Sequence, residues 1–269
     1  MRKLARFVPK SRVKLIFRAG TYPETRGILK QMSDAPSLVL FPGLGADSRA
    51  FALQRSLPFP LQLGEWPEPE SRNETLAHYS HRIADAIEPR KNLFVGGVSL
   101  GAMVALETAR LLGARGVLLI GGCTSGQQIS PAFRSVLRAG AAMPTRMIRP
   151  TLLLAPGAFL LFENLTRDHR RLMTRALREH SPAQTQWSCR AILDWECCAM
   201  PPGAPVYSIH GERDEIIPLR NVRVDQVVPG GRHLINLEKA GEVNRFLEEK
   251  MRGGKDGVVI PDTGAIGAR

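Results

Sequence analysis

The sequence predicts an α/β fold in which a mostly parallel sheet is flanked by helices and carries a helical lid insertion. Short apolar runs alternate with helix-forming segments along most of the 269 residues, a pattern typical of parallel strands joined by helices. Several of these runs are continuously apolar, as strands buried on both faces require. The alternation is interrupted over residues 126–200, where the pattern is helical and rich in arginine.

The elements follow from these patterns in chain order. Strands are expected at Ser37–Phe41, Leu61–Trp66, Leu93–Val95, Gly116–Ile120, Ala204–Ile209 and Val222–Val228. Helices are expected at Arg49–Leu57, Glu74–Ile87, Ala102–Leu111 and Ala240–Met251. The second of these helices is the clearest, because its apolar residues recur at helical spacing and share one face. A further segment with Trp187 and Trp195, Gln184–Glu196, is expected to pack onto the core.

The segment Leu93–Ala105 is the most informative. Its apolar strand turns through glycines into a helix, and the turn holds the pattern G-x-S-x-G over Gly97–Gly101. A serine on such a bend is held in a strained conformation with its hydroxyl exposed above the sheet. The pattern predicts that Ser99 is a nucleophile. The alternative is a glycine-rich strand exit whose serine only caps the helix.

A serine nucleophile needs a base, and the base needs an orienting group. Asp214 follows a later predicted strand, and His233 follows the last one. We expect His233 to take the proton of Ser99 and Asp214 to orient the imidazole. His210 is assigned instead to supporting the turn that carries Asp214.

An oxyanion formed at this serine needs two backbone donors. Leu100, the residue after the nucleophile, is expected to supply one N–H. Leu44, in the glycine-rich loop after Ser37–Phe41, is expected to supply the other. No cofactor or metal site is predicted, because the four cysteines show no paired C-x-x-C spacing.

The formal net charge is +12 and is unevenly distributed. Residues 1–30 hold nine Lys or Arg against one acid, and residues 126–196 hold ten Arg against five acids. Such regions attract anionic partners, and an anionic membrane surface or an acidic protein is expected; simple solubility is the alternative. Nucleic acid is not expected, because no aromatic residues are interleaved with the basic ones.

The predicted organisation is a basic arm (1–35), a core (36–125 and 201–252), a helical lid (126–200) and a flexible tail (253–269). No stretch has the ~18 uninterrupted apolar residues of a membrane span, and no signal peptide is recognised. We therefore expect a cytoplasmic protein, with peripheral membrane association as a further possibility through the basic arm.

Taken together, these motifs resemble the α/β-hydrolase superfamily over residues 36–250. Phe41–Gly45 stands where many members have the oxyanion loop, Gly97–Gly101 matches the nucleophile elbow, and His210–Asp214 and Gly231–His233 match the acid and histidine loops. The sequence departs from the superfamily at Pro42, where histidine is usual, and in the short region before Ser37.

Within this superfamily the chain is similar to small lidded carboxylesterases, including the pimeloyl-acyl-carrier-protein methyl esterase type. That resemblance implies that a basic lid receives an acidic carrier protein, through Arg134, Arg138, Arg146 and Arg149 here. The resemblance and the motifs predict a serine hydrolase that cleaves a small acyl ester or thioester. Leu152, Leu153, Phe159 and Phe162 are expected either to shape an apolar acyl site or simply to pack within the lid. The alternative is a binding module with this fold that is recruited to anionic membranes or an acidic carrier by its basic arm and lid.

Overall fold

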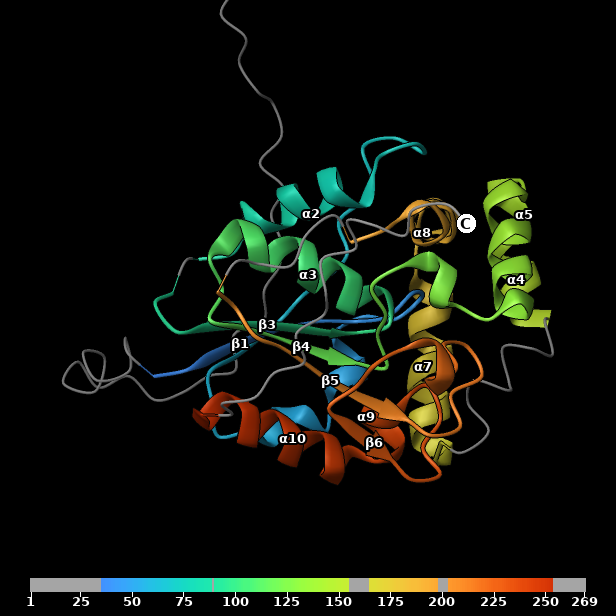
Figure 1. The fold of residues 1–269 in the computed structure, drawn as a ribbon. Coiled ribbons are helices and arrows are strands. Elements are labelled where there is room, and N and C mark those ends of the chain that lie inside the picture. Colours follow the sequence, from blue (N-terminus) through green and yellow to red (C-terminus); the bar gives the residue numbers. More distant parts are fainter. Residues whose placement is uncertain (1–34, 89, 155–164, 198–202, 254–269) are drawn as a thin grey trace, which may run out of the picture.

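A computed structural model describes residues 35–88, 90–154, 165–197 and 203–253 (Figure 1). The predicted flexible tail lies outside these residues except for Gly253, as does the predicted basic arm except for residue 35. Phe159 and Phe162 lie outside them too, and the side chains of Leu152 and Leu153 are likewise not described. Among the described residues, no helix combines the length and apolar character needed to cross a bilayer.

The sheet has six strands in the order β2-β1-β3-β4-β5-β6, and every pairing between them is parallel. Within the described residues the sheet therefore contains no antiparallel strand. The strands are β1 Ser37–Phe41, β2 Leu61–Leu63, β3 Leu93–Val98, β4 Gly116–Ile120, β5 Val206–Gly211 and β6 Gln226–Val228.

Helices cover both faces of the sheet (Figure 1). On one face lie α2 (Leu76–Ala84) and α3 (Leu100–Leu112), and on the other lie α9 (Ile235–Glu238) and α10 (Ala240–Gly253). Alternate residues of β1 belong to different apolar clusters. Val39 belongs to the cluster that includes residues of α3, and Leu38 belongs to the cluster that includes residues of α10. Burial on both faces explains the continuous apolar runs of the sequence.

Two edge strands are shorter than predicted. The strand expected over Leu61–Trp66 ends at Leu63, and the one expected over Val222–Val228 begins at Gln226. Each edge strand pairs with only one neighbour, so hydrogen bonding to that neighbour limits its length. Before β6, the Asp225 carboxylate accepts the Ser208 N–H at 2.6 Å and fixes the chain entering the strand.

The predicted helix Arg49–Leu57 is instead two short 3-10 helices, Ser48–Phe51 and Gln54–Ser56. The buried Gln54 side chain donates to the Asn236 carbonyl at 2.9 Å and to the Asn244 side chain at 3.0 Å. These tertiary hydrogen bonds fix the segment against α9 and α10. They cannot be predicted from the spacing of apolar residues in the segment, so the sequence pattern alone indicated one helix.

In the described part of the chain, four α-helices lie between β4 and β5, and we call them the insertion helices: α4 Pro131–Ala142, α5 Thr145–Leu154, α7 Arg167–Glu179 and α8 Pro182–Asp194. They lie beyond the carboxyl ends of the strands (Figure 1). The helix α8 is anchored to the core, because Trp187 donates to the Glu74 carbonyl at 2.7 Å and Trp195 donates to the Glu107 carboxylate at 2.8 Å. Trp195 lies one residue past the end of α8, so the two tryptophans do not share a helix, but both pack on the core as expected.

Candidate active site

Ser99 lies between β3 and α3, in the strained conformation that the sequence pattern predicts. Its backbone has φ 54° and ψ −117°, and it is the one non-glycine residue with positive φ in the described part of the chain. Its side chain makes no capping hydrogen bond to α3. The capping alternative is therefore wrong, since a capping serine would accept a bond from the first turn.

Two glycines make this turn possible. A Cβ at Gly97 would lie 2.8 Å from the Ala102 nitrogen, and a Cβ at Gly101 would overlap the Phe41 carbonyl. The chain enters and leaves the turn at backbone contact distance, so side chains are excluded there. The result is a serine held at the N-terminus of a helix of 13 residues, where the helix dipole favours negative charge.

Asp214 and His233 are joined by a hydrogen bond. The Nδ1 of His233 lies 2.7 Å from Oδ2 of Asp214, and both residues are buried. The other carboxylate oxygen accepts the N–H groups of Ile216 and Ile217, each at 2.9 Å. Because Nδ1 donates to a carboxylate, the neutral imidazole keeps its Nε2 lone pair free to act as a base.

The surroundings of Asp214 favour its charged form. Burial raises its pKa, but the electrostatic attraction of the His233 ring and the hydrogen bonds from His210 and His233 outweigh burial and hold the pKa well below the ordinary value of 3.8. An ionised carboxylate at neutral pH can orient His233 and stabilise the imidazolium.

Ser99 and His233 line the same cavity, from the segments that follow β3 and β6 at the carboxyl edge of the sheet. In the described chain no hydrogen bond joins the Ser99 hydroxyl to the His233 ring. Such bonds are often long in ligand-free enzymes and tighten when substrate binds. The structure thus brings all three predicted side chains to one region, with the acid–base pair already formed.

The two predicted backbone donors also lie near Ser99. Leu100 is the first residue of α3, and Leu44 lines the cavity in the loop after β1. A Cβ at Gly43 would lie 3.6 Å from the Ser99 Cβ, so this loop is in contact with the serine. Among the described backbone hydrogen bonds, neither Leu44 nor Leu100 donates its N–H. Both donors are therefore available to an oxyanion.

The cavity has a volume of about 590 Å³ and a largely apolar wall. Its walls come from the insertion helices as well as the core, including Phe133 and Leu137 of α4, Met173 and Leu177 of α7, and Cys189 and Ile192 of α8. The side chains predicted to shape an acyl site, those of Leu152, Leu153, Phe159 and Phe162, lie outside the described part of the chain. The lining residues of α4, α7 and α8 could not be recognised from the sequence, because helical spacing is the same for a core and for a cavity wall.

His210 does more than support the turn. It is the fifth residue of β5, not a loop residue, and its Nε2 lies 3.2 Å from Oδ2 of Asp214. The flanking acids have other partners: Glu212 accepts the Gly230 N–H, and Glu215, which also lines the cavity, lies 3.6 Å from Arg232. The sequence signal for His210 was its position four residues before Asp214, which does not reveal that the loop folds back onto the strand.

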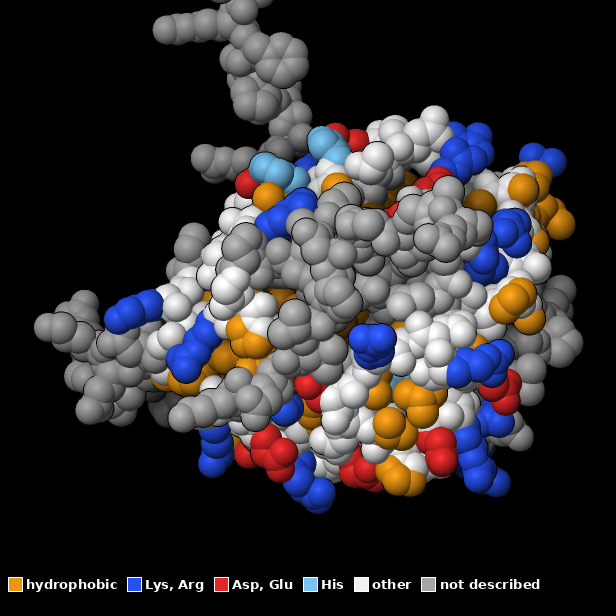
Figure 2. All heavy atoms as spheres, viewed as in Figure 1, with side chains coloured by type: hydrophobic (Ala, Val, Ile, Leu, Met, Phe, Trp, Pro, Cys, Tyr) orange, Lys and Arg blue, Asp and Glu red, His pale blue; other side chains and the backbone are white. Residues whose placement is uncertain are grey.

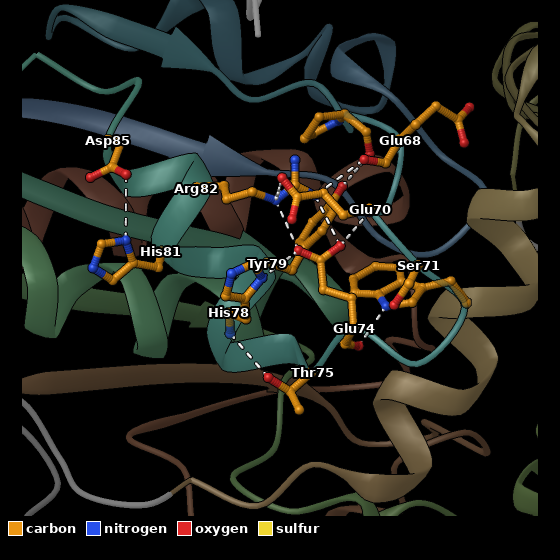
Figure 3. A network of polar contacts seen from close by, with 12 residues as sticks. Glu68, Glu70, Ser71, Glu74, Thr75, His78, Tyr79, His81, Arg82 and Asp85 are labelled. Carbon is orange, nitrogen blue, oxygen red and sulfur yellow. Dashed lines mark hydrogen bonds and ion pairs between the residues drawn. The ribbon is translucent and has the colours of Figure 1, made fainter. Parts of the chain in front are cut away.

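A second polar cluster lies away from this cavity, at the start of α2 (Figure 3). Ligand atoms of Glu70, Glu74 and His78 lie within 4.8 Å of one another. However, Arg82 binds Glu74 through two nitrogens, at 2.8 and 2.9 Å. The guanidinium supplies the positive charge that a cation would bring, so the geometry is that of an ion-pair network.

This network predicts a pH-dependent contribution to stability. Burial raises the pKa of Glu74, but the hydrogen bonds from Arg82, the Glu70 N–H and His78 hold it below the ordinary value of 4.5. Stability from this group is therefore present above pH 4.5 and is lost as pH falls through the lowered pKa of the folded state. We expect Glu74→Gln to lower the free energy of unfolding by about 1–3 kcal/mol at neutral pH.

Urea unfolding of wild type and Glu74→Gln at neutral and acidic pH measures this effect. The difference between the two proteins should shrink as the pH falls below 4.5. Glu88→Gln, at an exposed position after the same helix, is the matched control and should leave the free energy unchanged. A Glu74→Gln difference that is independent of pH would contradict the assignment.

The family model described as the alpha/beta hydrolase family matches residues 38–246, and the chain belongs to this family. It is therefore an enzyme of the hydrolase class. No curated protein matches the sequence.

Solved structures share the fold at low identity. An esterase from Exiguobacterium antarcticum is 16% identical with a TM-score of 0.63, over 81% of this chain and 92% of that one. An enol-lactonase from Burkholderia xenovorans LB400 is 15% identical with a TM-score of 0.62, over 82% and 92%. A thermophilic esterase from Thermogutta terrifontis is 16% identical with a TM-score of 0.59, over 81% and 90%. The resemblance to the pimeloyl-acyl-carrier-protein methyl esterase type stays a prediction.

Proposed function

We propose that this protein is a serine hydrolase that cleaves a carboxylic ester or thioester through an acyl-enzyme on Ser99. The observation that carries the proposal is the strained Ser99 at the N-terminus of α3, in one cavity with a His233 that is bonded to Asp214. A strained serine that does not cap its helix has no evident structural use, whereas a nucleophile needs that exposure.

The proposed reaction has two halves. In the first, the Ser99 hydroxyl attacks the carbonyl carbon while His233 Nε2 accepts its proton, and the imidazolium then protonates the leaving alcohol or thiol. In the second, His233 takes a proton from water, which attacks the acyl-enzyme and releases the acid and Ser99. The N–H groups of Leu44 and Leu100 hold the oxyanion in both halves.

The apolar cavity favours a substrate whose acyl group is apolar and binds within it. Its apolar walls can remove hydrocarbon from water, worth about 0.8 kcal/mol for each CH₂ buried. With a volume of about 590 Å³ it is in the range of sites for small molecules. We further propose that the segment 126–200, which contains the insertion helices, acts as the lid of this site.

Labelling with a fluorophosphonate probe tests the nucleophile. The wild-type protein should be labelled at Ser99, with the position located by mass spectrometry of the modified peptide. Ser99→Ala should not be labelled, and Ser125→Ala, a serine of the loop after β4, is the control that keeps labelling. Folded wild-type protein that hydrolyses p-nitrophenyl esters without being labelled would refute the proposal.

We also propose that the basic insertion helices bind an anionic partner, a membrane surface in preference to a carrier protein. On α7 five arginines are exposed: Arg167, Arg170, Arg171, Arg175 and Arg178. Arg138 and Arg146 are exposed on α4 and α5, which hold no acidic residue, whereas Arg134 is partly buried and the side chain of Arg149 is not described. Lys and Arg side chains gather among hydrophobic ones along the edge near α4 and α5 (Figure 2).

Co-sedimentation with vesicles tests this second proposal. Anionic vesicles should retain the protein at low salt and release it at high salt, because exposed charges are screened. Deletion of residues 1–30 should weaken retention if the basic arm contributes to peripheral binding. Equal binding to neutral vesicles, or binding to an acidic carrier protein with no vesicle binding, would overturn it.

A further inference from the structure

His210 is a fully buried histidine that contacts the predicted catalytic acid. Its Nε2 lies 2.7 Å from the Ile217 carbonyl oxygen and 3.2 Å from Oδ2 of Asp214. A carbonyl oxygen only accepts hydrogen bonds, so the ring proton must be on Nε2. The other nitrogen, Nδ1, is buried and has no hydrogen-bond partner among the described residues. A proton on Nδ1 would be buried without an acceptor, so the contacts define one neutral tautomer.

These contacts close a small ring of residues around Asp214. The N–H of Ile217 donates to Oδ1 of Asp214 at 2.9 Å, and the carbonyl of the same residue accepts from His210. His210 then returns to the carboxylate through Oδ2, the oxygen that also binds His233. Each oxygen of the carboxylate therefore has defined partners, and these contacts restrict its rotation.

We infer that His210 is a positioning residue for the catalytic acid: a neutral imidazole whose Nε2–H donates to the Ile217 carbonyl and makes a second, longer contact with Oδ2 of Asp214, so that Oδ2 faces His233. The inference rests on the proposed function, because His210 acts through Asp214 and His233. His210 is not among the residues that line the cavity, so it has no direct contact with substrate.

Two substitutions separate positioning from simple packing. Glutamine can place an amide N–H near the position of Nε2, whereas leucine fills similar space without a donor. We expect His210→Leu to lower kcat about 10- to 100-fold, since a small misplacement of reacting groups has effects of this size. The KM should stay within about twofold, because ground-state binding is untouched. His210→Gln should recover most of the lost kcat.

Ser208→Ala is the matched control, a substitution at another buried residue, two positions earlier on the same face of β5. It should leave kcat unchanged. Melting temperatures of all variants show whether they are folded. Equal kcat for the folded glutamine and leucine variants would overturn the inference, as would full activity of His210→Leu.

The pH profile provides a readout that packing alone would not change. The titratable groups that face Asp214 are His233, His210 and Cys123, and burial raises the pKa of the Cys123 thiol to about 12, so it is uncharged at neutral pH. Loss of the donor at position 210 should raise the pKa of Asp214. Titration of the Asp214 carboxylate, followed by ¹³C NMR of labelled aspartate, should therefore occur at higher pH in His210→Leu than in wild type. It should keep the wild-type position in His210→Gln.

The tautomer can be observed without any substrate. Two-bond ¹H–¹⁵N correlation spectra of wild-type protein with ¹⁵N-labelled histidine should show one ring protonated on Nε2 only at neutral pH. The signals of the His210 ring are identified by their absence from the spectrum of His210→Gln. An Nδ1-protonated ring or an imidazolium at this position would overturn the inference even if the leucine variant did not fold. Failure of fluorophosphonate to label Ser99 would instead refute the proposed function, so the two failures are distinguishable.

Discussion

Replacement of Ser99 by glycine is expected to stabilise the protein while abolishing its activity. The backbone at Ser99 has φ 54° and ψ −117°, a region that glycine enters with little strain and other residues do not. Strain of this kind is worth about 1–3 kcal/mol. Loss of the hydroxyl should lower kcat by about a million-fold, as expected for removal of a nucleophile.

Ser99→Ala is the matched variant, because it removes the hydroxyl but keeps a Cβ in the strained conformation. Both variants should be inactive on p-nitrophenyl esters, and only the glycine variant should gain stability. Its melting temperature should exceed that of Ser99→Ala by about 2–4 °C for each kcal/mol of strain released. Equal stability of the two variants would show that the observed backbone angles are not strained in solution.

The second large effect is expected at Gly101, where the first turn of α3 passes β1. An added Cβ would overlap the Phe41 carbonyl group and lie 2.5 Å from the Pro42 carbonyl oxygen. Both obstacles are backbone atoms of the central sheet and its exit loop, so no side-chain rotation can relieve the overlap. We expect Gly101→Ala to lower the free energy of unfolding by more than about 4 kcal/mol, or to prevent folding.

Urea denaturation and the yield of folded protein measure this effect. Gly241→Ala is the control, since a Cβ there meets nothing within 4 Å and Gly241 lies in α10. That variant should gain up to about 1 kcal/mol from helix propensity. A Gly101→Ala protein within about 1 kcal/mol of wild type would mean that α3 can move away from β1 at little cost, a result that close packing does not allow.

Much of the fold was predictable because buried strands are continuously apolar in sequence. The runs at Ser37–Phe41 and Gly116–Ile120 became strands with the predicted bounds, since central parallel strands are apolar throughout. The edge strands β2 and β6 were overestimated, because their length depends on one neighbour and not on their own composition. The domain boundaries stay predictions.

The candidate site was predictable as far as chain order determines it. Ser99, Asp214 and His233 each follow a strand of the same parallel sheet, so their loops meet at one edge. The contact between His210 and Asp214 was not predictable, because it depends on how tightly the loop after β5 turns back. The wall of the cavity was not predictable either, since Phe133 and Leu137 have the same spacing in a helix that closes a cavity and in one that fills a core.

One arrangement at this edge of the sheet limits how the enzyme can be redesigned. Ile216 and Ile217 contribute side chains to the wall of the cavity and backbone N–H groups to Oδ1 of Asp214. A substitution made there to admit a longer or branched chain would also shift the carboxylate. Changes of selectivity are better sought at Phe133 or Leu137 of α4, which line the cavity and give no hydrogen bond to Asp214 in the described chain.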